Sequence, residues 1–158
     1  MTDDGAPLQL LDRGYRAIMR QVVETATAPH FTALAAELAI PVEQARQLSH
    51  ELVSITPGWM APETDLFASF PPFNLQPTQY RVTVDGVGGW YAQCGLEATA
   101  VRWLFPGKTI RVEAPCLCCG EVMVVEMHDE EIVATEPAEI VGYTSDVIGG
   151  SAESRPFR

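Results

Sequence analysis

The sequence is poor in basic residues and has no long apolar run. Only 10 Lys and Arg stand against 21 Asp and Glu in 158 residues, a formal net charge of −11. Such an acidic chain repels nucleic-acid phosphates and anionic lipid surfaces, so neither is an expected partner. No stretch approaches the ~18–20 apolar residues of a membrane span, and the first four residues are acidic where a secretory leader would be basic. We therefore expect a cytoplasmic protein.

Several catalytic motifs are missing as well. The sequence has no Gly-rich phosphate loop, no Gly-x-Ser-x-Gly elbow and no His-Glu-x-x-His pair. His30, His50 and His128 show no mutual spacing, so we interpret them as surface or capping residues rather than metal ligands. These absences leave cysteine as the residue type with the clearest chemical potential.

No cysteine occurs before Cys94, and all four lie within 26 residues. A chain without a secretory leader, with 47% hydrophobic residues, can build a core without disulfides, so we expect reduced thiols. Clustered reduced thiols indicate metal binding, redox chemistry or nucleophilic chemistry; otherwise they are small buried apolar residues.

The first 75 residues are predicted to form a helical, winged-helix-like unit. Apolar spacing predicts helices over Leu10–Thr25, Phe31–Ala39 and Val42–Ser54, and residues 56–60 could begin a wing. The helix-turn-helix pattern is typical of DNA binding. Residues 1–75 hold 4 basic and 9 acidic side chains, which argues against contacts with phosphates and favours a structural or protein-interaction unit.

Residues 76–148 are predicted to form a β-rich core, followed by a tail over 149–158. Alternating apolar residues predict strands near Val82–Val84, Ile110–Val112, Glu121–Met127 and Ile132–Thr135, with one helix between the first two. The fold class is α+β: the helical unit packs on a small mixed or antiparallel sheet with one embedded helix.

Cys94 lies where an extended segment gives way to that helix. A sulfur at a helix start meets unpaired amides and the positive end of the helix dipole, so we expect this position to favour thiolate. Glu97 follows three residues later on the same face. The pair joins a soft nucleophile to a proton carrier, although Glu97 could also be a first-turn acid that suits the dipole.

Cys116, Cys118 and Cys119 lie in a second motif, Pro-Cys-Leu-Cys-Cys-Gly, between two predicted strands. A Cys-x-x-Cys-Gly turn brings two thiolates together and is half of a zinc knuckle. A closed zinc site needs two further ligands, for which the chain offers Cys94, Cys118, His128 or a carboxylate without a second spaced pair. Zinc binding and capture of another thiophilic ion both remain open.

The residues around these cysteines resemble those of the alkylmercury lyases. The resemblance lies in Trp90–Ala98, Phe105–Lys108, Ala114–Cys116 and Glu136–Ala138. It implies a helical, winged-helix-like unit before a mixed sheet that holds the catalytic cysteine. It also implies protonolysis of carbon–mercury bonds by two cysteines and an aspartate, with mercury as substrate and product ion and no other cofactor.

Carried over by position, the resemblance makes Cys94 the first catalytic cysteine and puts Glu97 where the family has its aspartate. Cys116 matches a cysteine that the family does not need for chemistry. The family's second catalytic cysteine lies in a C-terminal segment without a counterpart here, since no cysteine follows Cys119. The resemblance thus leaves Cys116, Cys118 or Cys119 to supply the second thiolate.

Two hypotheses follow. In the first, a shortened alkylmercury lyase uses Cys94, Glu97, Cys116 and Cys119 in catalysis. In the second, the same scaffold is a non-catalytic metal-binding or sensing protein for mercury, zinc or copper, with Cys94, Cys116, Cys118 and Cys119 as ligands. Expected partners are a small organomercurial or a soft metal ion, and a homodimer is left open.

Overall fold

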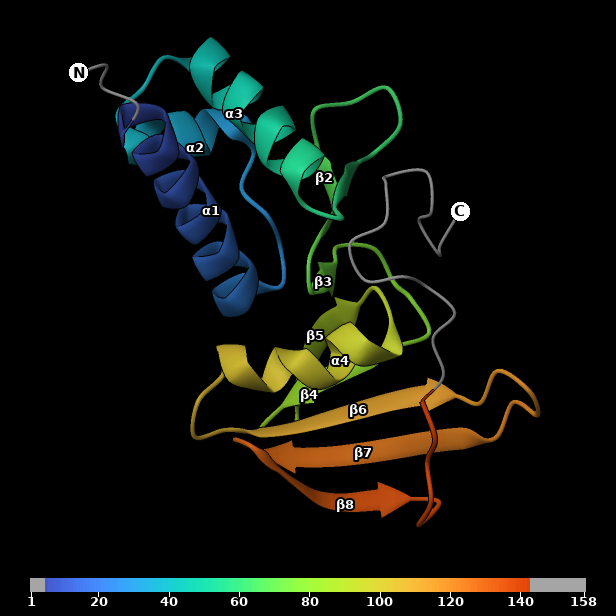
Figure 1. Ribbon diagram of the computed structural model, residues 1–158. Coiled ribbons are helices and arrows are strands. Elements are labelled where there is room, and N and C mark those ends of the chain that lie inside the picture. Colours follow the sequence, from blue (N-terminus) through green and yellow to red (C-terminus); the bar gives the residue numbers. More distant parts are fainter. Residues whose placement is uncertain (1–4, 143–158) are drawn as a thin grey trace. The chain divides into compact units, whose positions relative to one another are not determined.

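The computed structural model describes residues 5–142 (Figure 1). The chain forms two compact units that divide after Phe70. The described residues contain four α-helices, one 3-10 turn and antiparallel strands, which confirms the predicted α+β class. The predicted tail over 149–158 lies outside the described residues.

The first unit consists of three helices and a hairpin. Helix α1 spans Gly5–Thr25, α2 spans Phe31–Leu38 and α3 spans Val42–Ile55. Strands β1 (Trp59–Met60) and β2 (Phe67–Phe70) then pair antiparallel. Helix α1 begins before the predicted Leu10, whereas α2 and α3 end within one residue of the predicted positions.

Buried residues explain these helices. Each has an apolar stripe that recurs at helical spacing, and α2 ends because Ala39 adopts the left-handed conformation (φ 55°). The buried apolar residues of the three helices include Ala17, Ile18, Val22, Leu34, Leu38, Ala45, Leu48 and Leu52. His30 caps α2 by accepting the Thr32 backbone N–H, in agreement with its interpretation as a capping residue.

The second unit is an antiparallel sheet with a helical segment beside it. Its strands lie in the order β3-β5-β4-β6-β7-β8. Their bounds are Phe73–Asn74 for β3, Arg81–Val84 for β4, Val87–Ala92 for β5, Thr109–Pro115 for β6, Val122–His128 for β7 and Glu131–Glu136 for β8. Ile110 and Val112 are buried at alternate positions of β6, as the sequence pattern predicted, and Ala114 continues the alternation.

The helix predicted from Cys94 to Leu104 consists of two pieces. Helix α4 spans Gly95–Ala100, and a 3-10 turn spans Val101–Leu104. Both lie along one face of the sheet (Figure 1), where Ala98 and Val101 are fully buried. Their burial fixes the start of α4, and with it Cys94, relative to the strands.

Strand β5 is longer than the sequence suggested. Its pairing with β4 shifts register between Val82 and Thr83, and it contains Gly88 and Gly89, which weaken a strand signal. The short strands β2 and β3 also lie outside the strands that the sequence pattern predicted.

The register of β4 aligns the ends of its two neighbours. Arg81 is opposite Tyr91 of β5 on one side and opposite Glu113 of β6 on the other. Since both neighbours run antiparallel to β4, β5 and β6 run parallel to each other, about 10 Å apart. Cys94 follows the end of β5 and Cys116 follows the end of β6, so both cysteines lie at the same edge of the sheet.

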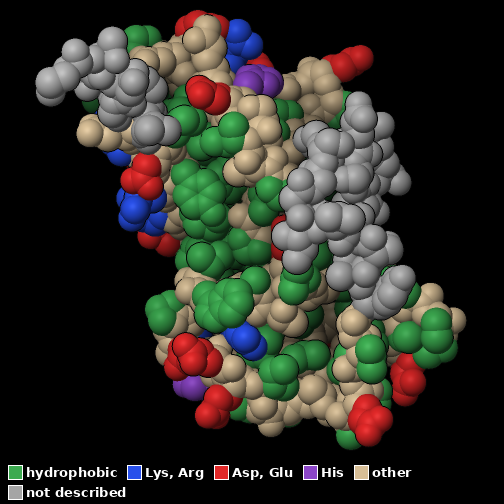
Figure 2. Space-filling model, viewed as in Figure 1, with side chains coloured by type: hydrophobic (Ala, Val, Ile, Leu, Met, Phe, Trp, Pro, Cys, Tyr) green, Lys and Arg blue, Asp and Glu red, His purple; other side chains and the backbone are tan. Residues whose placement is uncertain are grey.

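No helix of residues 5–142 is long and apolar enough to cross a membrane. On the face shown in Figure 2, basic side chains form a few separate spots rather than a continuous patch.

Candidate thiol and carboxyl site

Cys94 is the N-cap of α4. Its backbone is extended (φ −150°, ψ 172°), and its sulfur accepts the Glu97 backbone N–H at 3.5 Å. The preceding residue is tied to the turn that leads into β3, because the Gln93 N–H donates to the Pro72 carbonyl at 3.3 Å. The thiol is therefore held in place by local backbone geometry.

The Cys94 thiol is half-buried, and this burial dominates its ionisation. Burial raises the pKa of Cys94 above its ordinary value of 9.0, and the amide of Glu97 offsets this only in part. The expectation that the helix start favours thiolate is therefore wrong for the unliganded protein. Desolvation outweighs the amide, so a metal ion must displace the thiol proton.

Glu97 is the most perturbed carboxyl of the site. Burial raises its pKa from 4.5 to about 7, opposed by a hydrogen bond with the Cys94 side chain. Its Oε2 atom is buried without a hydrogen-bond partner among the described residues. A carboxyl left so poorly solvated remains protonated in a large fraction of molecules near neutral pH, and so it can donate a proton.

Cys94 and Glu97 therefore form one proton-sharing pair. The spacing of three residues predicted that their side chains would be within reach, and in the structure each side chain shifts the pKa of the other. Near neutral pH the sulfur keeps its proton, because its pKa is raised, and the carboxyl is protonated in only part of the molecules. Transfer of the thiol proton to the carboxylate form of Glu97 would create a thiolate and a neutral acid together.

The second motif is the turn between β6 and β7, which we call the cysteine turn (residues 116–121). Backbone hydrogen bonds close it from Cys116 N to the Glu121 carbonyl at 2.7 Å and from Gly120 N to the Cys116 carbonyl at 2.8 Å. Gly120 has φ 76°, a conformation that favours glycine. The turn is thus folded by its own backbone.

The sulfurs of Cys116, Cys118 and Cys119 all lie within 4.8 Å of one another. Cys118 and Cys119 are exposed and Cys116 is partly so. Backbone amides of Cys118 and Cys119 lower the pKa of Cys116 to about 7, whereas the neighbouring sulfurs raise the pKa of Cys118. The arrangement supplies one readily ionised thiol and two more beside it.

Cys94 does not belong to this three-sulfur group, nor does any histidine or carboxylate of the described residues. The sequence motif suggested His128 and Cys94 as further zinc ligands. Instead His128 is 3.6 Å from Asp129, at the other end of β7 from the cysteine turn. Within residues 5–142, no four-ligand zinc set is therefore present.

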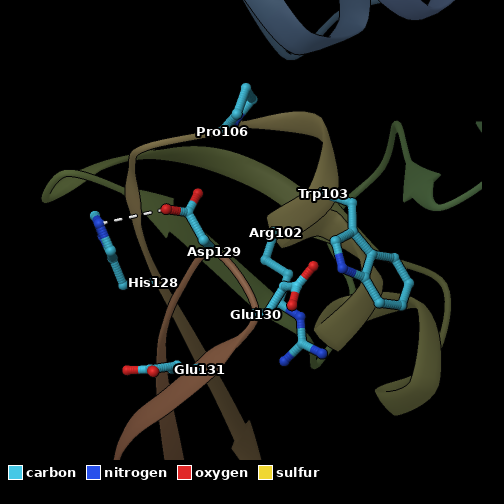
Figure 3. A pocket seen from close by; sticks show the side chains of 7 residues that line it. All are labelled: Arg102, Trp103, Pro106, His128, Asp129, Glu130 and Glu131. Carbon is cyan, nitrogen blue, oxygen red and sulfur yellow. Dashed lines mark ion pairs between the residues drawn. The ribbon is translucent and has the colours of Figure 1, made fainter.

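A separate hollow of about 530 Å³ is lined by the β7–β8 turn and the 3-10 turn (Figure 3). Its residues are Arg102, Trp103, Pro106, His128, Asp129, Glu130 and Glu131, and none is a cysteine. Sequence reasoning did not single out Arg102, whose Nε is buried without a hydrogen-bond partner among the described residues. The only sequence signal was an arginine within an apolar run.

The fold and the site together define a class of protein. An α+β chain with a half-buried cysteine capping a helix, an adjacent neutral acid and exposed thiols at the same sheet edge is suited to soft-metal chemistry. The family model for alkylmercury lyase (MerB) matches residues 73–152, which is half of the chain. The chain belongs to the alkylmercury lyase family.

Individual relatives agree with this assignment. An alkylmercury lyase of Staphylococcus epidermidis is 27% identical over 129 residues, covering 80% of this chain and 55% of that protein. One from Bacillus cereus is 34% identical over 67 residues, covering 42% of this chain and 30% of that protein. This chain thus spans about half the length, or less, of these relatives.

The fold is also shared with a solved structure. The mercury-bound form of MerB2 matches with a TM-score of 0.64 at 13% identity, covering 82% of this chain and 65% of that one. This likeness extends the α+β assignment across most of the chain.

Proposed function

We propose that this chain cleaves carbon–mercury bonds of small organomercurials by protonolysis at Cys94 and Glu97. The observation that carries the proposal is a carboxyl with a pKa of about 7, buried at one oxygen, on the residue whose backbone N–H is accepted by a half-buried thiol. Membership of the alkylmercury lyase family supports the reaction class.

The first step is capture of mercury by sulfur. The Cys94 thiol displaces the counter-ion X⁻ from R–Hg–X and loses its proton, so that a sulfur–mercury bond forms. Proton transfer to Glu97 removes the negative charge that a carboxylate would otherwise hold in a poorly solvated position. Capture therefore loads the acid that the next step needs.

The second step is proton transfer to carbon. A second thiolate binds mercury, the Glu97 carboxyl gives its proton to the carbon, and the electron pair of the carbon–mercury bond forms the new C–H bond. The balance is R–Hg–X plus two thiols giving R–H, Hg²⁺ held by two thiolates, and HX. No electron acceptor or donor is consumed.

The second thiolate of this proposal comes from the cysteine turn, with Cys116 or Cys119 as the donor. Register supports this choice, because Cys94 and Cys116 follow parallel strands at one sheet edge. Joint coordination requires two sulfurs within about 5 Å for bonds of ~2.3 Å. Cys94 lies outside the three-sulfur group, so the proposal requires one turn sulfur to lie within this distance of Cys94 when mercury is bound.

The test is incubation of the purified protein with an arylmercury compound while release of the arene is followed. We expect release by the wild type, none by Cys94→Ser, and a large loss in Glu97→Gln. Tight retention of mercury by the wild type without arene release would contradict the lyase proposal. It would favour the alternative of a non-catalytic metal-binding protein, which the cluster of three sulfurs supports.

A further inference from the structure

We propose that Cys116, Cys118 and Cys119 form a second, separate site that holds one thiophilic metal ion by three thiolates. The ion that fits the chemistry of the protein is Hg²⁺, the product of the reaction proposed above. The existence of the three-thiolate site rests on the turn alone; only the choice of Hg²⁺ as the ion in use rests on the proposed function.

The three sulfurs of the turn are close enough to share one ion. Three sulfurs around one ion at ~2.3 Å are separated from one another by about 3.8–4.0 Å in tetrahedral or trigonal geometry. The three sulfurs of the turn already lie within 4.8 Å of one another. An ion can therefore be bound after shifts of less than about 1 Å, which side-chain rotation at exposed cysteines supplies.

The backbone of the turn is held in shape by hydrogen bonds. The turn is closed by hydrogen bonds at both ends of the Cys116–Gly120 segment, and Pro115 is paired with Val122 as the last pair of the β6–β7 ladder. These contacts hold the turn in shape without an ion. Binding then entails little ordering of the chain, which favours affinity.

The composition of the site decides which ion it takes. Three sulfurs select soft ions such as Hg²⁺ over hard ions such as Mg²⁺ or Ca²⁺. A structural zinc site is closed by four ligands, whereas no fourth ligand joins these sulfurs within residues 5–142. Because Cys118 and Cys119 are exposed, an incoming thiol can reach the ion, so we infer an exchangeable site rather than a permanent one.

The position of the turn gives the site a use in the proposed reaction. Mercury released at Cys94 and one turn sulfur meets two further sulfurs on the same turn. The two remaining turn thiols each lose a proton and bind the mercury. The bond between mercury and Cys94 then breaks, and the Cys94 thiolate takes up a proton. Mercury remains Hg²⁺ throughout, and the net change is one proton released.

The test uses Cys94→Ser protein, in which only the turn cysteines remain, and Hg²⁺ alone as the probe. We expect one tightly held Hg²⁺ per chain in the presence of a competing monothiol, with three sulfur neighbours by X-ray absorption. Two sulfur neighbours, or no Hg²⁺ retained against the competitor, would overturn the proposal.

Matched variants in the same background separate the site from nonspecific thiol binding. Leu117→Ser changes the most exposed apolar residue of the turn, 79% accessible, and leaves all sulfurs in place, so it should bind as Cys94→Ser does. Cys118→Ser should reduce the sulfur count from three to two and weaken retention at least tenfold. Equal retention in both variants would exclude a three-thiolate site.

This outcome is distinguishable from failure of the lyase proposal. Cys94→Ser is inactive in arene release under that proposal, so ion binding by it does not depend on catalysis. If the wild type releases no arene but Cys94→Ser still shows three sulfurs around Hg²⁺, the site stands and the lyase reaction does not. If arene is released but the turn binds no ion, the reverse holds.

Discussion

The sulfur of Cys94 accepts the backbone N–H of Glu97 at 3.5 Å, and the two side chains lie near enough for each to shift the pKa of the other. A thiol and an acid are thus joined through the first turn of one short helix. Their relative position is set locally and does not depend on a contact with a distant part of the chain.

Glu97→Gln should lower the rate of arene release from bound arylmercury by about 10²–10⁴-fold, the usual contribution of a general acid. The amide keeps the shape of the side chain and cannot supply the proton. Glu97→Asp keeps the acid and should retain much more activity than Glu97→Gln. Equal rates for the two variants would show that the acid is not the proton donor.

The single-turnover rate of arene release should fall as pH rises above about 7. Because the pKa of Glu97 is raised to about 7, the carboxyl is mostly protonated below that pH. Above it, the protonated fraction falls about tenfold per pH unit. Following release from protein already loaded with arylmercury removes the separate pH dependence of capture. A rate that rises between pH 7 and 9 would contradict this role.

Glu97→Gln should also stabilise the protein at pH 8. Because the folded pKa of Glu97 is about 7 and its ordinary value is 4.5, the folded state binds more protons between these values, and stability falls as pH rises through that window. Allowing for the partial solvent exposure of this side chain, we expect Glu97→Gln to increase the free energy of unfolding at pH 8 by about 1–2 kcal/mol. Denaturant unfolding at pH 4.5 is the control, where this contribution should vanish.

Cys94→Ser and Cys94→Ala should separate the capping role of Cys94 from its chemistry. Serine is a favourable N-cap, so Cys94→Ser should change the free energy of unfolding by less than about 0.5 kcal/mol, while Cys94→Ala loses about 1 kcal/mol. Both should fail to release arene. Activity in either variant would place the essential sulfur elsewhere.

Gly120→Ala should strain the cysteine turn. The φ of 76° at this position costs an L-residue roughly 1–2 kcal/mol, although no neighbouring atom would clash with the added Cβ. We expect weaker Hg²⁺ retention in the Cys94→Ser background with unchanged far-UV circular dichroism. Retention equal to that of Cys94→Ser would show that turn conformation does not control the site.

Local patterns were predictable from the sequence. The helical stripes of α2 and α3 and the alternation of β6 gave correct elements, because each pattern reflects burial of one face. The contact between Cys94 and Glu97 was also predictable, since it depends only on a spacing of three residues in a helix.

Properties that depend on tertiary packing were not predictable. The pKa of Cys94 is raised rather than lowered because burial by the surrounding chain outweighs one amide. Likewise, the Cys-x-x-Cys spacing indicated that the turn sulfurs converge. The strand register was needed to place Cys94 at the same edge of the sheet, and the positions of the sulfurs were needed to show that it lies outside their group. The full length of β5 was not predictable either, because Gly88 and Gly89 weaken its strand pattern.

The hydrogen bonds that close the cysteine turn have a kinetic consequence. Small zinc domains commonly fold only when their ion binds, so their ion uptake is limited by folding. Here Cys116 is already tied to Glu121 and Gly120 in the metal-free chain. Ion uptake and release at this turn should therefore follow the rates of thiol exchange, and removing the ion with a chelator should leave the protein folded.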